Sequence, residues 1–159
     1  MHQITLTEPE QRLVQYVAKK RISFHKHKEK TVSENYNRWE RTQIEIDVEG
    51  FGGELAYCKL MNIYPDLDVE LNNSEYDCLS HNGERIDVKT TRYKKGHLIV
   101  PVRKSNYPAD KYVLVTGDFP VYNVVGECNA GELFREENIK DFGRGAGYTL
   151  EQDKLEDVL

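Results

Sequence analysis

Two aspartates and one lysine in the middle of the chain have the residue types and spacing of a catalytic or metal-binding group. Asp87 and Lys89 lie in the stretch Arg85-Ile-Asp-Val-Lys89, where charged residues alternate with apolar ones. Alternation with a period of two predicts a half-buried strand and places Asp87 and Lys89 on the same face. Asp77 lies upstream, on what we expect to be the first strand of a β-hairpin.

The loop between the two strands decides which residue lies opposite Asp87. A two-residue turn at Asn82-Gly83 would pair Cys78 with Asp87 and send Asp77 to the other face. A three-residue loop over His81–Gly83, with its glycine in the left-handed conformation, would instead set Asp77 directly across from Asp87. In that register the Cβ atoms of the two aspartates would be roughly 5 Å apart.

The three-residue loop has a chemical consequence. Two carboxylates that face one another repel each other unless a cation lies between them. Mg²⁺ is typically held by one or two carboxylates together with water and substrate phosphate. This register therefore predicts a divalent metal site at Asp77 and Asp87.

A third acid, Glu54, lies near the start of an expected helix. The segment from Gly50 to Asn62 begins with glycines at 50, 52 and 53 and is apolar on most sides of a helix, which predicts burial. A glutamate in the first turn can complement the helix dipole and reach solvent. An ionised group on a buried helix needs a cation or a hydrogen-bond donor. Both interpretations of Glu54 stay open.

The length and composition favour one folded domain. The chain has 159 residues, of which 38% are hydrophobic and 31% charged, which suits a globular protein rather than a disordered one. No apolar run reaches the length of a membrane span, and the N-terminus lacks a signal-peptide core, so we expect a cytoplasmic protein without a membrane partner. The three cysteines form no CxxC pair, and we expect buried free thiols.

Charge is distributed unevenly along the chain, although the net charge is −5. Residues 19–30 contain six Lys or Arg and one acid, and residues 85–104 contain seven and one. Residues 132–159 contain eight acids and four bases. The two basic runs favour contact with a phosphate backbone.

Local signals predict the flanking elements. A capping box from Thr7 to Glu10 begins a helix that we expect to end near Lys20, and Ser33 can cap a second helix. Residues 44–48 fit either a strand or a helix. The apolar run Tyr112–Val115 predicts a central strand that is buried on both faces.

These elements suggest a division of the single domain over residues 1–159. We expect a helical extension over residues 1–48, a core over 49–126 and C-terminal helices over 127–159. The C-terminal helices are expected at Ala130–Glu137, where Asn129 can cap the first turn, and at Glu151–Leu159.

Three short motifs, in this order, resemble those of the PD-(D/E)xK nuclease superfamily. They are Gly53-Glu54-Leu-Ala56, Tyr76-Asp77 and Asp87-Val-Lys89, and the resemblance covers roughly residues 50–115. Tyr76 stands where the superfamily has its proline, and Asp87 stands where glutamate is often found. The chain looks most like the small stand-alone nucleases of phages and prophages. The resemblance implies a restriction-endonuclease-like α/β fold, an αβα sandwich with a mixed central β-sheet, here with extra N-terminal helices.

The resemblance also implies a function, a metal-dependent nuclease that hydrolyses DNA phosphodiester bonds. Asp77 and Asp87 would bind Mg²⁺ or Mn²⁺ together with the backbone carbonyl of Val88. Glu54 would hold a water at the metal or help to bind a second ion. Lys89 would orient the water or stabilise charge on the phosphate.

The DNA backbone would be contacted by basic residues that follow the hairpin. These basic residues are Arg92, Lys94, Lys95, Arg103 and Lys104.

Two other functions fit the same motifs. One alternative is a junction- or flap-specific endonuclease of the same fold, which would call for a homodimer. The other is a non-catalytic nucleic-acid-binding protein. A plain protein-interaction domain is supported only by the acidic C-terminus. A phage-encoded protein would act in the host cytoplasm.

Overall fold

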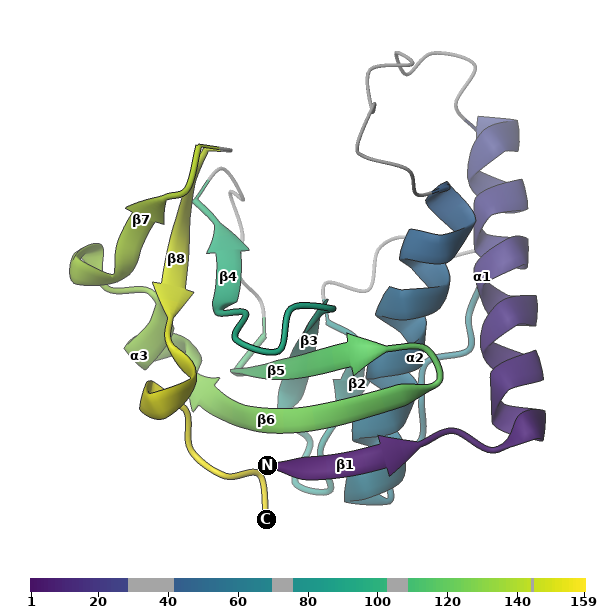
Figure 1. Cartoon of the computed structure of the whole chain (residues 1–159), viewed down its shortest axis with the longest axis horizontal. Helices are drawn as coiled ribbons and strands as arrows, with labels where there is room; N and C mark the ends of the chain where they lie inside the picture. Colours follow the sequence, from purple (N-terminus) through teal and green to yellow (C-terminus); the bar gives the residue numbers. More distant parts are fainter. Residues whose placement is uncertain (29–41, 70–75, 103–108, 144) are drawn as a thin grey trace.

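The computed structural model describes residues 1–28, 42–69, 76–102, 109–143 and 145–159, with only the backbone of residues 25–28. Within these residues the chain forms strands, helices and two short 3-10 turns (Figure 1). In chain order they are β1 (His2–Thr5), α1 (Glu8–Lys28), α2 (Gln43–Met61), β2 (Cys78–Leu79), β3 (Arg85–Thr91), β4 (Leu98–Pro101), β5 (Lys111–Asp118), β6 (Val121–Asn129), α3 (Ala130–Leu133), the turn Glu136–Asn138, β7 (Ile139–Asp141), β8 (Ala146–Leu150) and the turn Gln152–Lys154.

The larger sheet has five strands in the order β1-β6-β5-β3-β2. Strands β3 and β5 are parallel, and the other neighbours are antiparallel, so the sheet is mixed. The predicted α/β class with a mixed sheet is therefore confirmed. Strand β5 lies between β3 and β6, and residues 112–116 are buried, as predicted for Tyr112–Val115.

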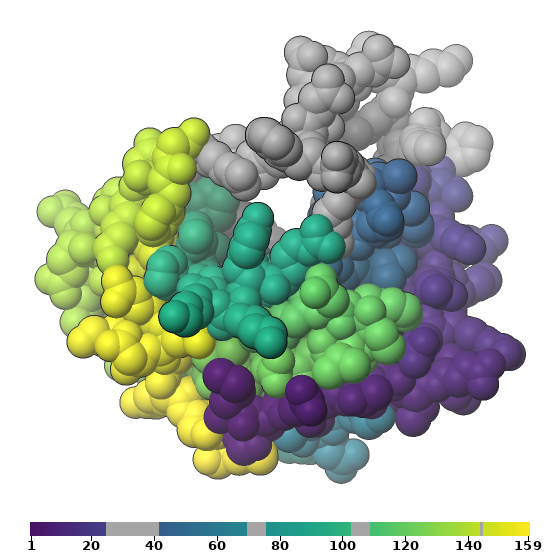
Figure 2. All heavy atoms as spheres, viewed as in Figure 1, coloured from purple at the N-terminus to yellow at the C-terminus, as the bar shows by residue number. Residues whose placement is uncertain are grey.

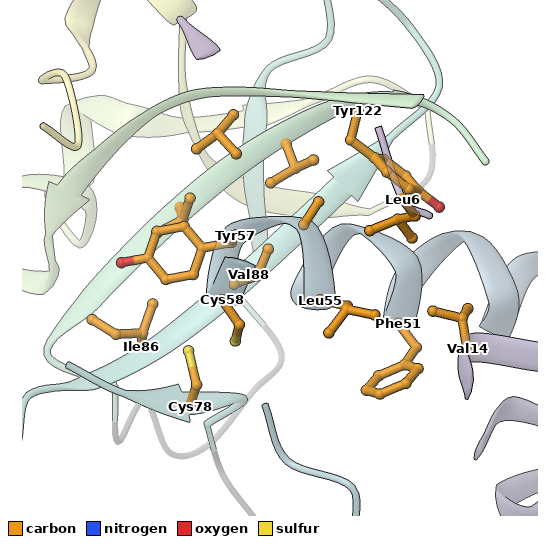
Figure 3. Close-up of a cluster of buried hydrophobic side chains, with 14 of the residues drawn as sticks. Leu6, Val14, Phe51, Leu55, Tyr57, Cys58, Cys78, Ile86, Val88 and Tyr122 are labelled. Atoms are coloured by element: carbon orange, nitrogen blue, oxygen red, sulfur yellow. The ribbon is translucent and has the colours of Figure 1, made fainter. Parts of the chain in front are cut away.

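Helices α1 and α2 pack on one face of this sheet (Figure 1). Figure 3 shows the core that they form, in which Phe51 and Leu55 of α2 lie among Val14 of α1 and the sheet residues Ile86 and Val88. All five side chains are less than one tenth exposed. The side chains of Ile86 and Val88 point toward the helices. Because successive side chains of a strand point to opposite faces, those of Asp87 and Lys89 lie on the other face of β3.

The opposite face of the sheet is covered differently from the prediction. A second, three-stranded antiparallel sheet, in the order β4-β8-β7, and the short helix α3 contribute to a second core cluster with β5 and β6. Leu98, Val100 and Leu133 from these elements pack with Tyr112 and Leu114 of β5. The third layer of the predicted αβα sandwich is thus made mainly of strands.

Two expectations about the N-terminal part are corrected. Helix α1 ends at Lys28 rather than near Lys20, because Lys and Arg are good helix formers and Phe24, seven residues after Val17, continues its apolar stripe. The N-terminal residues are also more than a helical extension, because β1 pairs with β6 in the main sheet. The Thr7 capping box is supported by the Thr7 amide, which donates to Glu10 Oε2 at 2.6 Å.

The ambiguous segment at 44–48 is helical and belongs to α2. A capping box at Thr42 begins this helix, with the Thr42 amide donating to Glu45 Oε2 at 2.7 Å. Helix α2 therefore crosses the expected boundary between residues 48 and 49. The second helix predicted after Ser33 lies outside the described residues.

The C-terminal part, residues 127–159, is less helical than predicted, although its first helix begins at Ala130 after the cap residue Asn129, as expected. Helix α3 covers only Ala130–Leu133, and β7 and β8 follow it. The predicted closing helix is a single 3-10 turn, after which Glu156 forms a bridge with Glu127 of β6. Pairing with β6 and β4 gives these backbone groups partners that an isolated short helix would lack.

The three cysteines are free and buried, as predicted. Cys58 of α2 and Cys78 of β2 face one another in Figure 3. A thiol-to-thiol hydrogen bond with Cys58, and then burial, raise the pKa of Cys78. Both thiols therefore act as small apolar groups between α2 and the hairpin. In the described segments, no helix is both long enough and apolar enough to cross a bilayer.

Candidate active site

The hairpin that carries the candidate residues closes with the three-residue loop His81–Gly83. The Ser80 amide donates a hydrogen bond to Glu84 O at 2.9 Å, and the Gly83 amide donates one to Ser80 O at 2.9 Å. Gly83 has a φ of +82°, the left-handed conformation that this loop requires. The ladder pairs Cys78 with Ile86 and Leu79 with Arg85. The three-residue loop is therefore confirmed, and the two-residue turn is excluded.

This register brings Asp77 to the strand that carries Asp87. Asp77 directly precedes β2, and its amide donates to Ile86 O at 2.8 Å. Its Oδ2 accepts a hydrogen bond from the backbone amide of Val88 at 2.6 Å. The amide and carbonyl of one strand residue face the same neighbour, so the Val88 carbonyl borders the Asp77 side of the strand.

Asp87 and Lys89 share one face of β3, as their spacing predicted. Lys89 Nζ donates to Asp87 Oδ1 in a short ion pair. The Asp87 side chain is 7% exposed, whereas that of Lys89 is 29% exposed and so reaches solvent. The Asp87 carboxylate is thus buried, and its cationic partner Lys89 is partly exposed.

Glycines bring Glu54 close to the same strand. A Cβ at Gly53 would lie 2.1 Å from Thr90 Oγ1, and a Cβ at Gly52 would lie 2.1 Å from the Tyr122 hydroxyl. Neither position could carry a side chain without displacing a side chain of the sheet, so the glycines allow α2 to approach β3 and β6. Glu54 follows them directly, and its side chain is 19% exposed.

A residue that we did not predict, Arg21 of α1, also reaches this site. Its Nη1 lies 3.8 Å from Glu54 Oε2, and its guanidinium lies over the Phe51 ring at 4.7 Å. Its Nε and Nη2 donate to the carbonyls of Asp68 and Asp66 at 3.1 and 2.9 Å. Arg21 supplies the cation that a buried Glu54 needs. Arg21 belongs to the first basic run, residues 19–30, but the helix was predicted to end near Lys20 and so did not include it.

Burial and mutual repulsion disturb the acid–base behaviour of this group. Burial, followed by repulsion from Asp87, raises the pKa of Asp77 to about 6, against the opposing effects of Lys89 and the Val88 amide. Burial and then repulsion from Asp77 raise the pKa of Glu54 well above its usual value, although Arg21 and Lys89 oppose this. Glu54, Asp77, Asp87 and Lys89 therefore interact as one electrostatic group, contributed by α2 and the hairpin.

The acids of this group do not form a ready-made metal cage. Within the described ranges, no three His, Cys, Asp or Glu side chains are arranged so that they could hold a metal ion. The Asp77 carboxylate is bonded to a backbone amide, Asp87 to Lys89, and Glu54 faces Arg21. At most two of the carboxylates can share an ion in this arrangement.

The basic residues predicted to contact DNA divide into two sets. Arg92, Lys94 and Lys95 are exposed and lie on the connection from β3 to β4. Arg92 Nε lies 3.3 Å from Asp118 Oδ1 of β5. Arg103 and Lys104 lie outside the described residues.

Residues 2–124 match the model of a family of unknown function, DUF5843. The matched region contains α1, α2 and the whole hairpin, and so all the residues of the candidate site. No curated protein and no solved structure matches the chain.

Proposed function

The chain belongs to the DUF5843 family of unknown function, and we propose from its site that it is a metal-dependent nuclease that hydrolyses phosphodiester bonds of DNA. One observation carries the proposal: Asp77, Asp87 and Lys89 are brought together by the three-residue loop, and Glu54 interacts electrostatically with all three. Buried acids with raised pKa values destabilise a fold and are therefore concentrated at functional sites.

We further infer that the core of the fold is restriction-endonuclease-like. The order of α2, the β2–β3 hairpin and the parallel neighbour β5 supports this, because it is the order that the PD-(D/E)xK resemblance implies. The second sheet, β4-β8-β7, would then be an addition to that core.

The donor set fits Mg²⁺ or Mn²⁺. Asp77 and Asp87 would bind the ion, with the Val88 carbonyl as a third oxygen, and two carboxylates are as many as Mg²⁺ commonly takes from a protein. The raised pKa of Asp77 supports this assignment, because the repulsion from Asp87 that contributes to it would be relieved by a cation. When bound, the ion would screen the phosphate and lower the pKa of water at the site.

The remaining residues have roles that need no direct contact with the ion. Lys89, whose side chain is partly exposed, would stabilise negative charge on the scissile phosphate. Glu54 would orient the attacking water, and Arg21 would hold the Glu54 carboxylate in position. Arg92, Lys94 and Lys95 would bind the phosphates on either side.

The proposal is tested by incubating the purified chain with supercoiled, linear duplex, single-stranded and branched DNA, with Mg²⁺, Mn²⁺ or EDTA. We expect at least one DNA to be cut with a metal ion and none with EDTA. Cutting of branched DNA alone would identify a junction- or flap-specific endonuclease. Binding without any cutting would support the non-catalytic alternative and contradict the proposal.

A further inference from the structure

The connection from β3 to β4 presents an aromatic ring among cations. Tyr93 is 69% exposed, and its neighbours Arg92, Lys94 and Lys95 are also exposed. In Figures 1 and 2, which share one view, this teal connection crosses the front of the molecule and its atoms project from this face. An exposed tyrosine alone needs no explanation, but one surrounded by three cations has the composition of a single-stranded nucleic-acid contact.

This connection, which we call the basic turn (residues 92–96), is held in place by hydrogen bonds. The amide of Gly96 donates to Tyr93 O at 2.8 Å, and the side chain of Gln152 donates to the carbonyls of Lys94 and Gly96 at 2.8 and 2.9 Å. A Cβ at Gly96 would lie 2.4 Å from Thr91 Cγ2, so the turn is also tightly closed. The Tyr93 ring is thus displayed on a fixed backbone, which reduces the entropy lost on binding.

The basic turn directly follows the strand that carries the candidate catalytic residues. Tyr93 is four residues beyond Lys89, a separation of at most about 13 Å along an extended chain. At about 3.4 Å for each phosphate of a DNA strand, that separation corresponds to roughly four nucleotides. A DNA strand that passes Lys89 can therefore reach the turn.

Tyr93 favours one form of DNA over another. In a duplex the faces of the bases are covered by their neighbours, so an aromatic ring can stack on a base only where the strand is unpaired. The cations of the turn can bind the phosphates of either form. Discrimination therefore depends on the tyrosine rather than on the charges.

We propose that the Tyr93 ring stacks on an unpaired DNA base and that the substrate of this site is DNA with a single-stranded segment at the point of cutting. This inference rests on the proposed nuclease function and names its substrate class.

Fluorescence anisotropy with a labelled 12-nucleotide single strand, and with a duplex of equal length, tests the inference in EDTA, where no cutting occurs. We expect Tyr93→Ala to weaken single-strand binding by roughly 5- to 150-fold, the factor that corresponds to about 1–3 kcal/mol for stacking one base. Duplex binding should be unchanged, and Tyr93→Phe should bind as the wild type does. The matched control is Tyr64→Ala, which removes a 79% exposed tyrosine with no Lys or Arg within four residues.

Three results would overturn the inference. They are unchanged single-strand binding by Tyr93→Ala, an equal loss for single strand and duplex, and failure of the wild type to bind the single strand at all. A strand with abasic sites, which offers phosphates without bases, should bind equally to wild type and Tyr93→Ala. Metal-dependent cutting by the wild type decides the nuclease proposal separately, because the anisotropy experiment requires no catalysis.

Discussion

Among single residues, the main property of the site is that three acidic side chains, Glu54, Asp77 and Asp87, are largely buried near one another. Burial and the Asp87 charge hold the pKa of Asp77 at about 6, above the ordinary value of an aspartate. The folded chain therefore binds more protons than the unfolded chain between about pH 4 and pH 6. The free energy of unfolding falls through that range as pH rises, and above pH 6 the whole penalty is present.

Asp77→Asn should remove this penalty while its side-chain oxygen still accepts the Val88 amide. We expect the variant to be more stable than the wild type by about 1–3 kcal/mol at pH 7.5 in EDTA, with little gain near pH 4. Urea unfolding at the two pH values measures the difference. Asp153→Asn, at an exposed aspartate, is the control and should change neither value. A variant that is less stable than wild type at pH 7.5 would refute the electrostatic account of Asp77.

At the scale of elements, the contact between α2 and the sheet depends on where its glycines lie. Gly50 and Gly53 belong to the same helix and differ in their surroundings. A Cβ at Gly53 would meet the Thr90 side chain, whereas a Cβ at Gly50 would meet no atom within 4 Å. Within the described residues, Thr90 Oγ1 is buried without a hydrogen-bond partner, so the contact is one of shape alone.

Gly53→Ala should lower the free energy of unfolding by about 1–3 kcal/mol, because the added methyl group forces α2 away from β3. Gly50→Ala should raise it by about 0.5–1 kcal/mol, because a helix favours alanine over glycine where space is open. Chemical denaturation of both variants measures the contrast. The Gly53→Ala cost should shrink in a Thr90→Ala background. Equal effects at positions 50 and 53 would contradict the packing described for Gly53.

Sequence signals predicted the elements whose patterns are local. Alternation placed Asp87 and Lys89 on one face, because it depends on neighbours in the chain. The sequence left two loops open for Asp77, and the structure has the three-residue one. Arg21 could not be found in this way, because its contacts lie 33 to 47 residues away, at Glu54, Asp66 and Asp68. The same reason explains the C-terminal part, where pairing of β8 with β4 replaced the predicted helices.

At the scale of the whole molecule, the chain ends complete the sheet and lie together. β1 forms one edge, and the terminal amine and His2 Nε2 contact Asp157 at 3.3 and 2.6 Å. The candidate site lies toward the other edge, where β2, the strand that borders β3 in the described residues, is two residues long. An ion that binds there and only to the folded chain would stabilise the whole molecule.

We expect Mg²⁺ or Mn²⁺ to raise the melting temperature of the wild type. An ion at a hundred times its Kd adds about 2.7 kcal/mol, or roughly 5–10 °C for a chain of this size. The shift should disappear in Asp77→Asn and persist in Asp153→Asn. Differential scanning fluorimetry with and without metal measures this shift. A melting temperature that neither ion changes would count against the metal site.

If Asp87 and Lys89 perform phosphodiester cleavage, as we propose, the most direct measurement is the initial cutting rate of single-stranded DNA with Mg²⁺ or Mn²⁺. The rate should fall at least ~100-fold in Asp87→Asn and in Lys89→Met, while Asp153→Asn cuts as the wild type does. Cutting that survives in either site variant, or a wild type that cuts no DNA with either ion, would contradict the assignment.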